Sequence, residues 1–263
     1  KGALDANTTS SNSTAVGTDA LGANTTGSDN TALGYAALRD NTTASNNTAV
    51  GYFALEANTT GINNTSVGSL SMTLNTTGAS NVAVGVGALD ANTTGDYNTA
   101  IGGSSLGENT TAGNNTAVGY LALANSTTAS NNTVVGRGAG DSVTTGGSNV
   151  IIGQGAATNQ TTASNNVIIG EGAGATVTDA STCILIGREA NVSASGRSEL
   201  VIGNTVVGKG DNTGLIYPPG GGGIYNGANT STWNQTSDRR IKKNIEDNTT
   251  GLDVINQIKV RNF

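Results

Sequence analysis

Side chains that commonly carry out catalysis or bind metals are scarce in this sequence. Among its 263 residues there is no His and a single Cys, Cys183. Zinc sites depend on His and Cys ligands, so neither a zinc site nor any other cofactor is expected. A calcium-binding β-roll carries Asp in phase in each repeat, whereas the aspartates here do not recur in phase. A glycosidase pair of carboxylates stays open, although scattered acids such as Asp40, Glu56 and Glu108 are typical of a solvated surface.

Further reactive side chains lie near the C-terminus. Residues 237–245 are Ser-Asp-Arg-Arg-Ile-Lys-Lys-Asn-Ile. Leu252, Ile255 and Ile258 follow at helical spacing, and residues 260–263 have the composition of a strand, so a short α+β segment is expected over 237–263. The simplest interpretation is a solvated basic loop before an amphipathic helix.

The order of these residues also resembles the start of the intramolecular chaperone domain of phage tail spikes, tail fibres and endosialidases. The matching residues are Ser237-Asp238-x-Arg240-x-Lys242-x-Asn244-Ile245, then Gly251-Leu252-Asp253-x-Ile255. In that family the domain trimerises, aligns the fibre and then cuts itself off. The resemblance implies that Ser237 is the nucleophile and Lys242 its general base for a cut beside Ser237. A Lys of lowered pKa can deprotonate a hydroxyl in this way. Because the family's domain is longer, we expect more chain beyond Phe263.

The rest of the chain is a strict repeat. A glycine returns every 17 residues without insertion, from Gly17 through Gly34 and Gly51 to Gly187. A unit of this length cannot bury an apolar face alone, so the units must stack. Residues 1–208 are therefore predicted to be all-β, forming a parallel β-roll or β-solenoid. Lys1 already stands inside a repeat, so we expect chain before it as well.

The three residues before each glycine are predicted to form a strand. In Thr48-Ala49-Val50, the first and third residues share one face and the middle residue takes the other. Both faces are apolar, increasingly so toward Ile184-Leu185-Ile186, as in a strand that is covered on both sides. A thin coil covers only one face. Because the middle residue is mostly Ala, we expect this face, including Ala117, to lie against neighbouring copies in a homotrimer.

Each unit continues with a second short apolar segment, such as Ala54-Leu55, and an Asn-Thr-Thr turn, such as residues 92–94. Stacked turns place identical side chains about 4.8 Å apart, so Asn and Thr are expected to form hydrogen-bonded ladders. Each Asn-Thr-Thr is also an N-glycosylation sequon, but the turn explains these residues without a glycan. Cys183 occupies a position held by Asn in nine of the eleven units and is expected to be a small buried side chain.

The unit Thr48-Ala49-Val50-Gly51-x-x-Ala54 resembles the head repeats of trimeric autotransporter adhesins and related viral and bacterial fibres. Those heads are left-handed parallel β-rolls wound three together, and the resemblance covers residues 1–208. It implies a left-handed coil and a trimer. Residues 209–236, with Pro218-Pro219 and a run of four glycines, are expected to be a neck between the array and the C-terminal segment.

Charge and hydropathy exclude several partners. Residues 1–235 hold six Lys and Arg against fourteen Asp and Glu, whereas residues 237–263 hold six against four. The array therefore offers no basic surface to nucleic acid. No apolar run approaches the roughly 20 residues of a membrane span, so membrane insertion is not expected.

These features predict a structural protein: the homotrimeric shaft of a viral or phage tail fibre, which attaches to a host cell-surface receptor such as a glycan. It would be found on the virion. The alternatives are a bacterial adhesin at the cell surface and the non-catalytic part of a glycan-degrading tail spike. The only catalysis expected is the single self-cleavage at Ser237.

Overall fold

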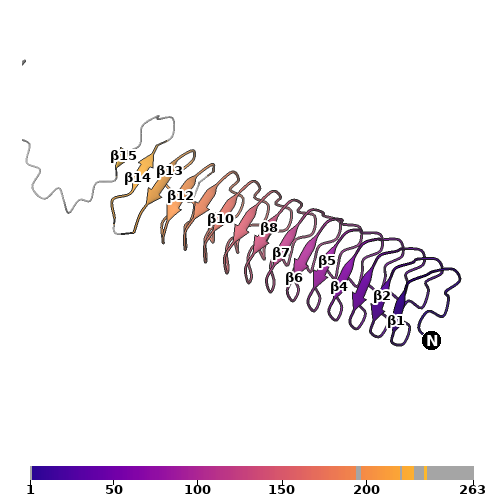
Figure 1. The fold of residues 1–263 in the computed structure, drawn as a ribbon. Helices are drawn as coiled ribbons and strands as arrows, with labels where there is room; N and C mark the ends of the chain where they lie inside the picture. The colour runs from indigo at the N-terminus through magenta and orange to yellow at the C-terminus, as the bar shows by residue number, and fades with distance from the viewer. Residues whose placement is uncertain (1, 194–196, 220, 228–233, 236–263) are drawn as a thin grey trace, which may run out of the picture.

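The computed structural model describes residues 2–193, 197–219, 221–227 and 234–235. They form one long coil of stacked turns (Figure 1). The described residues contain strands and no helix. Strands follow one another in chain order within a single 15-stranded sheet. The predicted all-β parallel solenoid with 17-residue spacing is therefore confirmed.

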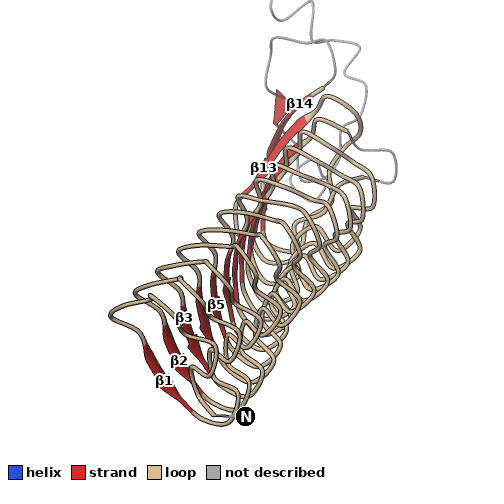
Figure 2. Cartoon of the chain, turned by 90° about the vertical axis from the view of Figure 1, so that its right-hand side faces the viewer, coloured by secondary structure: helices blue, strands red, loops and turns tan. Residues whose placement is uncertain are grey.

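The sheet runs along one side of the coil, and loops form the other sides (Figure 2). The regular strands are β1 (Thr14–Val16), β2 (Thr31–Leu33), β3 (Thr48–Val50), β4 (Thr65–Val67), β5 (Val82–Val84), β6 (Thr99–Ile101), β7 (Thr116–Val118), β8 (Thr133–Val135), β9 (Val150–Ile152), β10 (Val167–Ile169) and β11 (Ile184–Ile186). Each pairs in parallel with the next at equal repeat positions, so Thr48 lies between Thr31 and Thr65. Equal positions therefore form continuous columns along the coil.

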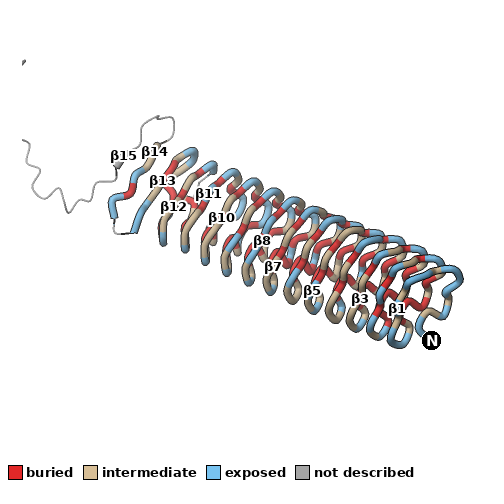
Figure 3. The backbone as a smooth tube through the Cα atoms, viewed as in Figure 1, coloured by how far each residue is buried: buried red, intermediate tan, exposed pale blue. Residues whose placement is uncertain are grey.

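The middle residue of each strand points into the coil, and the predicted orientation of the strands is wrong. Ala49 and Ala117 are 0% exposed, whereas Val16 and Leu33, at the third position, are 55% and 48% exposed. The burial pattern repeats along the whole array (Figure 3). Ala is small here because the interior is shared with a Leu from the opposite wall, not because another chain approaches. The first and third strand residues form the outer face.

The second apolar segment is a left-handed corner. Phe53 and Leu55 both have positive φ angles, 55° and 53°, a conformation that costs an ordinary residue about 1–2 kcal/mol. Full burial of Leu55 offsets this by about 1.5–3 kcal/mol. The backbone amide of Leu55 also donates to the carbonyl of Ser71 in the next turn, at 3.0 Å. The same corner recurs at Leu21, Leu38, Met72, Leu89, Leu106 and Leu123.

The repeating glycine is required by the close approach of the turns. Gly51 has a φ of 142°, and a Cβ atom placed on it would lie 2.4 Å from the carbonyl oxygen of Gly68. Every other residue would therefore clash with the backbone of the next turn. This contact explains why the glycine never changes while its neighbours do.

The predicted Asn ladders are present. Asn58 Nδ2 donates to Oδ1 of Asn41 at 3.0 Å and to the carbonyl of Gly61 at 2.9 Å. A second Asn column, which includes Asn47 and Asn64, links the turns through a backbone amide: the N–H of Asn64 donates to Oδ1 of Asn47 at 2.9 Å. The predicted Thr ladder is wrong, because Thr hydroxyls donate to backbone carbonyls of the next turn, as Thr59 does to Thr76 at 3.1 Å. The sequon residue Asn58 is 0% exposed, so the folded coil offers no amide there to a glycan.

The C-terminal end departs from the repeat. Strand β12 (Leu200–Gly203) follows β11 after 16 residues, and β13 (Gly214–Tyr217) continues the parallel sheet. β14 (Ile224–Asn226) and β15 (Asn234–Gln235) then pair antiparallel. Near this change of period, the carboxylate of Glu199 is 1% exposed and accepts hydrogen bonds from the amides of Ser193 and Gly210, at 2.8 and 2.5 Å. Glu199 thus ties the irregular loops together. The predicted neck at 209–236 and the segment at 237–263 stay predictions, the latter outside the described residues.

Candidate functional site

The predicted self-cleavage pair, Ser237 and Lys242, lies outside the described residues. Structural evidence on sites therefore comes from the coil. Among the features of the described surface are two hollows and a continuous uncharged face. No group of three His, Cys, Asp or Glu side chains is placed to hold a metal ion anywhere in the described part of the chain.

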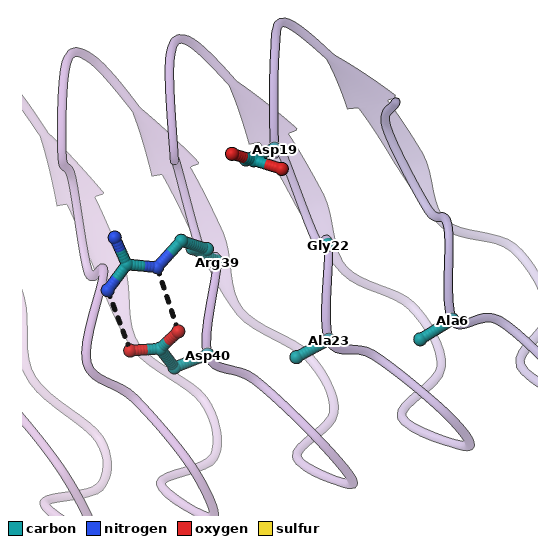
Figure 4. Close-up of a pocket in the computed structure, with 6 residues that line it drawn as sticks. All are labelled: Ala6, Asp19, Gly22, Ala23, Arg39 and Asp40. Carbon is teal, nitrogen blue, oxygen red and sulfur yellow. Dashed lines mark hydrogen bonds and ion pairs between the residues drawn. The ribbon is translucent and has the colours of Figure 1, made fainter. Parts of the chain in front are cut away.

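The first hollow lies across the N-terminal turns (Figure 4). It has a volume of about 420 Å³ and is lined by Ala6, Asp19, Gly22, Ala23, Arg39 and Asp40. It exists because Ala6 in the first turn and Gly22 and Ala23 in the second leave space beside Arg39 and Asp40 in the third. Arg39 and Asp40 therefore stand at one end of a shallow apolar floor, and Asp19 of the second turn also lines the hollow.

The guanidinium of Arg39 is ion-paired with two carboxylates of the protein. Its Nε and Nη2 donate to the two carboxylate oxygens of Asp40 at 2.8 and 3.0 Å, and Nη1 forms an ion pair with Glu56 in the next turn. The hydrogen bond to Asp40 raises the pKa of Arg39 further above its usual range. Burial raises the pKa of Glu56, and the attraction of Arg39 opposes this only in part. Exposed pairs of this kind contribute about 0–1 kcal/mol, so the cluster is a surface clamp between turns.

Two of the acids predicted to belong to a solvated surface are ion-paired. Asp40 and Glu56 share Arg39, whereas Glu108 is exposed as predicted. Near Glu108, burial raises the pKa of Asp90; backbone hydrogen bonds partly oppose this shift, and the charge of Glu108 adds to it. A shared counter-ion suits a structural role for Asp40 and Glu56.

Cys183 is buried, as predicted. Its backbone amide donates to Oδ1 of Asn166 at 2.8 Å and so continues the Asn column. Burial raises the pKa of the Cys183 thiol. Because the thiolate is the reactive form, we expect Cys183 to contribute to packing and not to act as a reactive thiol.

The second hollow was not found by sequence reasoning. It has a volume of about 230 Å³ and is lined by Tyr120, Leu121, Arg137, Gly138, Asp141, Gln154, Gly155 and Thr158. These residues come from the three consecutive corners that follow β7, β8 and β9. At the corner position of Phe53 and Leu121, the next two turns carry Gly138 and Gly155. A Cβ atom placed on Gly138 would meet nothing within 4 Å. The sequence signal for this hollow was therefore the change from Leu121 to Gly138 and Gly155 at one repeat position.

The outer strand face is the third feature. It consists of the first and third residues of β1 to β11, which are Thr, Val, Leu or Ile in every turn and never charged. Many of the third residues are exposed, namely Val16, Leu33, Val84, Ile101, Val135 and Ile152. A rise of about 4.8 Å for each turn gives this face a length of roughly 50 Å.

We compared the chain with known proteins, and no protein-family model, curated protein or solved structure matched it. The part of the chain that the structure describes contains no candidate for a membrane-spanning helix.

Proposed function

We propose that the protein is the shaft of a viral or phage tail fibre, works as a homotrimer and attaches the particle to a host cell-surface receptor. A β-solenoid of about twelve turns is compatible with a structural shaft. The observation that carries the proposal is the outer strand face, because a long uncharged strip that is rich in Val, Ile and Leu is costly to leave in water.

The repeat itself favours association between copies of this chain. Every turn presents an uncharged pair drawn from Thr, Val, Leu and Ile on the outer strand face, so a second copy aligned along the same axis meets a similar strip over its full length. Rotation about that axis closes the assembly, as in most homo-oligomers. The corrected strand orientation changes the contact residues from the Ala column to the Thr and Val columns, for example Thr116 and Val118.

The C-terminal segment completes the proposal. Its resemblance to an intramolecular chaperone suggests that residues 237–263 begin the domain that aligns the three chains. Ser237 and Lys242 would then perform one self-cleavage, and the protein would have no other catalytic activity. A bacterial adhesin or a glycan-degrading tail spike could use the same shaft.

Light scattering on the purified chain tests the central claim. Three chains in each particle would support the proposal, whereas a stable, well-folded monomer would refute it. Immunogold labelling then separates the virion from the bacterial surface as the site of the protein.

A further inference from the structure

We propose that the second hollow, between Tyr120 and Thr158, binds a neutral hexose unit of a glycan. This inference rests on the proposed attachment function and gives it a location. All lining residues come from one chain, so the hollow is complete without a partner.

The floor of the hollow is built from backbone. Gly138 and Gly155 hold the corner with φ angles of 61° and 60°, close to the 56° of Leu121 one turn earlier. The backbone path is therefore unchanged, and only the side chains are missing. A ring-shaped ligand can approach the backbone at this point.

The walls carry polar groups that the protein does not use. The guanidinium of Arg137 forms no ion pair with any described residue, and the side chains of Tyr120 and Gln154 form no hydrogen bond within the same part of the chain. In the first hollow, by contrast, Arg39 is held by two carboxylates. The side chains of Arg137, Tyr120 and Gln154 are thus free for a ligand, whereas the carboxylate of Asp141 also accepts a hydrogen bond from the hydroxyl of Ser142 at 3.4 Å.

The set of side chains matches the chemistry of a sugar. Arg137 can only donate, the carboxylate of Asp141 can only accept, and Gln154 and Thr158 can do both, which suits a ring of hydroxyl groups. The ring of Tyr120, which is 54% exposed, offers a flat surface to the C–H face of a pyranose. Arg137 and Asp141 compensate each other in charge, and the array is acidic overall. A neutral sugar is therefore favoured over an acidic one.

Single-site affinity for a hexose in an open hollow should be weak. Three chains in the proposed shaft would present three such hollows, and multivalent attachment to a cell-surface glycan would compensate.

Saturation-transfer NMR on the intact 263-residue chain tests this inference, with D-galactose, D-glucose and N-acetylneuraminic acid as probes. We expect a signal from at least one hexose, reduced about fivefold by Tyr120→Ala and abolished by Gly138→Leu. Leu121 occupies the same corner position, so Leu should be accepted by the fold. Gly87→Leu is the matched control, because Gly87 has the same conformation (φ 62°) but does not line the hollow.

Each outcome decides the proposal. Loss of signal in Gly138→Leu but not in Gly87→Leu supports it. Equal signals in both variants, equal loss in both, a signal from N-acetylneuraminic acid alone, or no signal from any probe would overturn it. Light scattering on the same samples keeps the two proposals apart, since a trimer that binds no sugar refutes only the sugar site.

Discussion

A Cβ atom placed on Gly140 would lie 3.1 Å from Cδ1 of Ile151 in the next turn. In earlier turns the same two positions are Leu89 and Ala100, both fully buried. A large corner residue thus faces a small strand residue in the first part of the coil, and the sizes are exchanged further on. Gly174, whose Cβ would lie 3.0 Å from Cδ1 of Ile168, shows a similar exchange. The interior keeps its volume while its residues change.

This exchange predicts strong coupling between Gly140 and Ile151. Gly140→Leu should overpack the interior and cost about 1–3 kcal/mol, and Ile151→Ala should cost about 2–5 kcal/mol. The double variant recreates the Leu89 and Ala100 pair, so its free energy of unfolding should fall by clearly less than the sum. Urea denaturation measures all three. Gly140→Leu combined with Ile168→Ala is the control, and additivity in both doubles would contradict the volume exchange.

Neighbouring strand residues should respond differently to a charge. Ala117→Glu buries an unpaired carboxylate inside the coil, so we expect loss of β-structure by circular dichroism. Val118→Glu places the carboxylate on the outer strand face and should leave the coil folded but monomeric by light scattering. Val118→Thr is the control, since Thr already occurs on this face. Trimers that persist in Val118→Glu would exclude this face as the interface.

The Asn ladder predicts that an inner residue matters more than the last one. Asn75 donates to Asn58 and to the carbonyl of Gly78, both at 3.0 Å, and accepts from Asn92 at 2.7 Å. Asn109 makes the two donor contacts, but its Oδ1 has no partner among the described residues. Asn75→Ala should therefore cost about 1 kcal/mol more than Asn109→Ala. Thermal melting compares the two, and equal losses would show that the ladder is not cooperative.

Asp90 should give stability a pH dependence. Burial raises its pKa in the folded chain, so the folded state binds the proton more readily than the unfolded state. The parent protein therefore gains stability from this group as the pH falls. Asp90→Asn should be more stable than the parent at pH 7, and the difference should vanish once Asp90 is protonated. Thermal melting from pH 7 to pH 3.5 measures the difference in stability between the variant and the parent. A difference that grows on acidification would contradict this prediction.

Self-cleavage is expected in a chain that carries a complete C-terminal domain. Denaturing gels should show one cut beside Ser237 after assembly, and none in Ser237→Ala or Lys242→Ala, which remove the nucleophile and its base. The cut would make assembly hard to reverse, because the chains lose the domain that aligned them. Equal cutting in all three proteins would assign the event to a host protease.

Much of the fold could be predicted because one contact between successive turns leaves no space for a side chain. The approach of Gly51 to the carbonyl of Gly68 fixes a glycine in every turn, and this glycine reveals the period. Strand orientation could not be predicted in the same way, because alternation defines two faces without saying which lies inside. The inner face is determined by the corner residue, because the buried side chain of Leu89 occupies the space beside the small side chain of Ala100. The hollow above Gly138 was not predicted, because the sequence alone does not show that the backbone of Gly138 has the conformation of Leu121 one turn earlier.

Each strand pairs with neighbours one turn away in the sequence, such as Thr48 with Thr31 and Thr65. Ordering each further turn closes a loop of the same short length, so the entropic cost of growth does not rise as the coil lengthens. Such a chain can fold vectorially during synthesis, with each completed turn acting as the template for the next. A ribosome that stalls within the array would leave behind a shorter coil, folded to its last full turn.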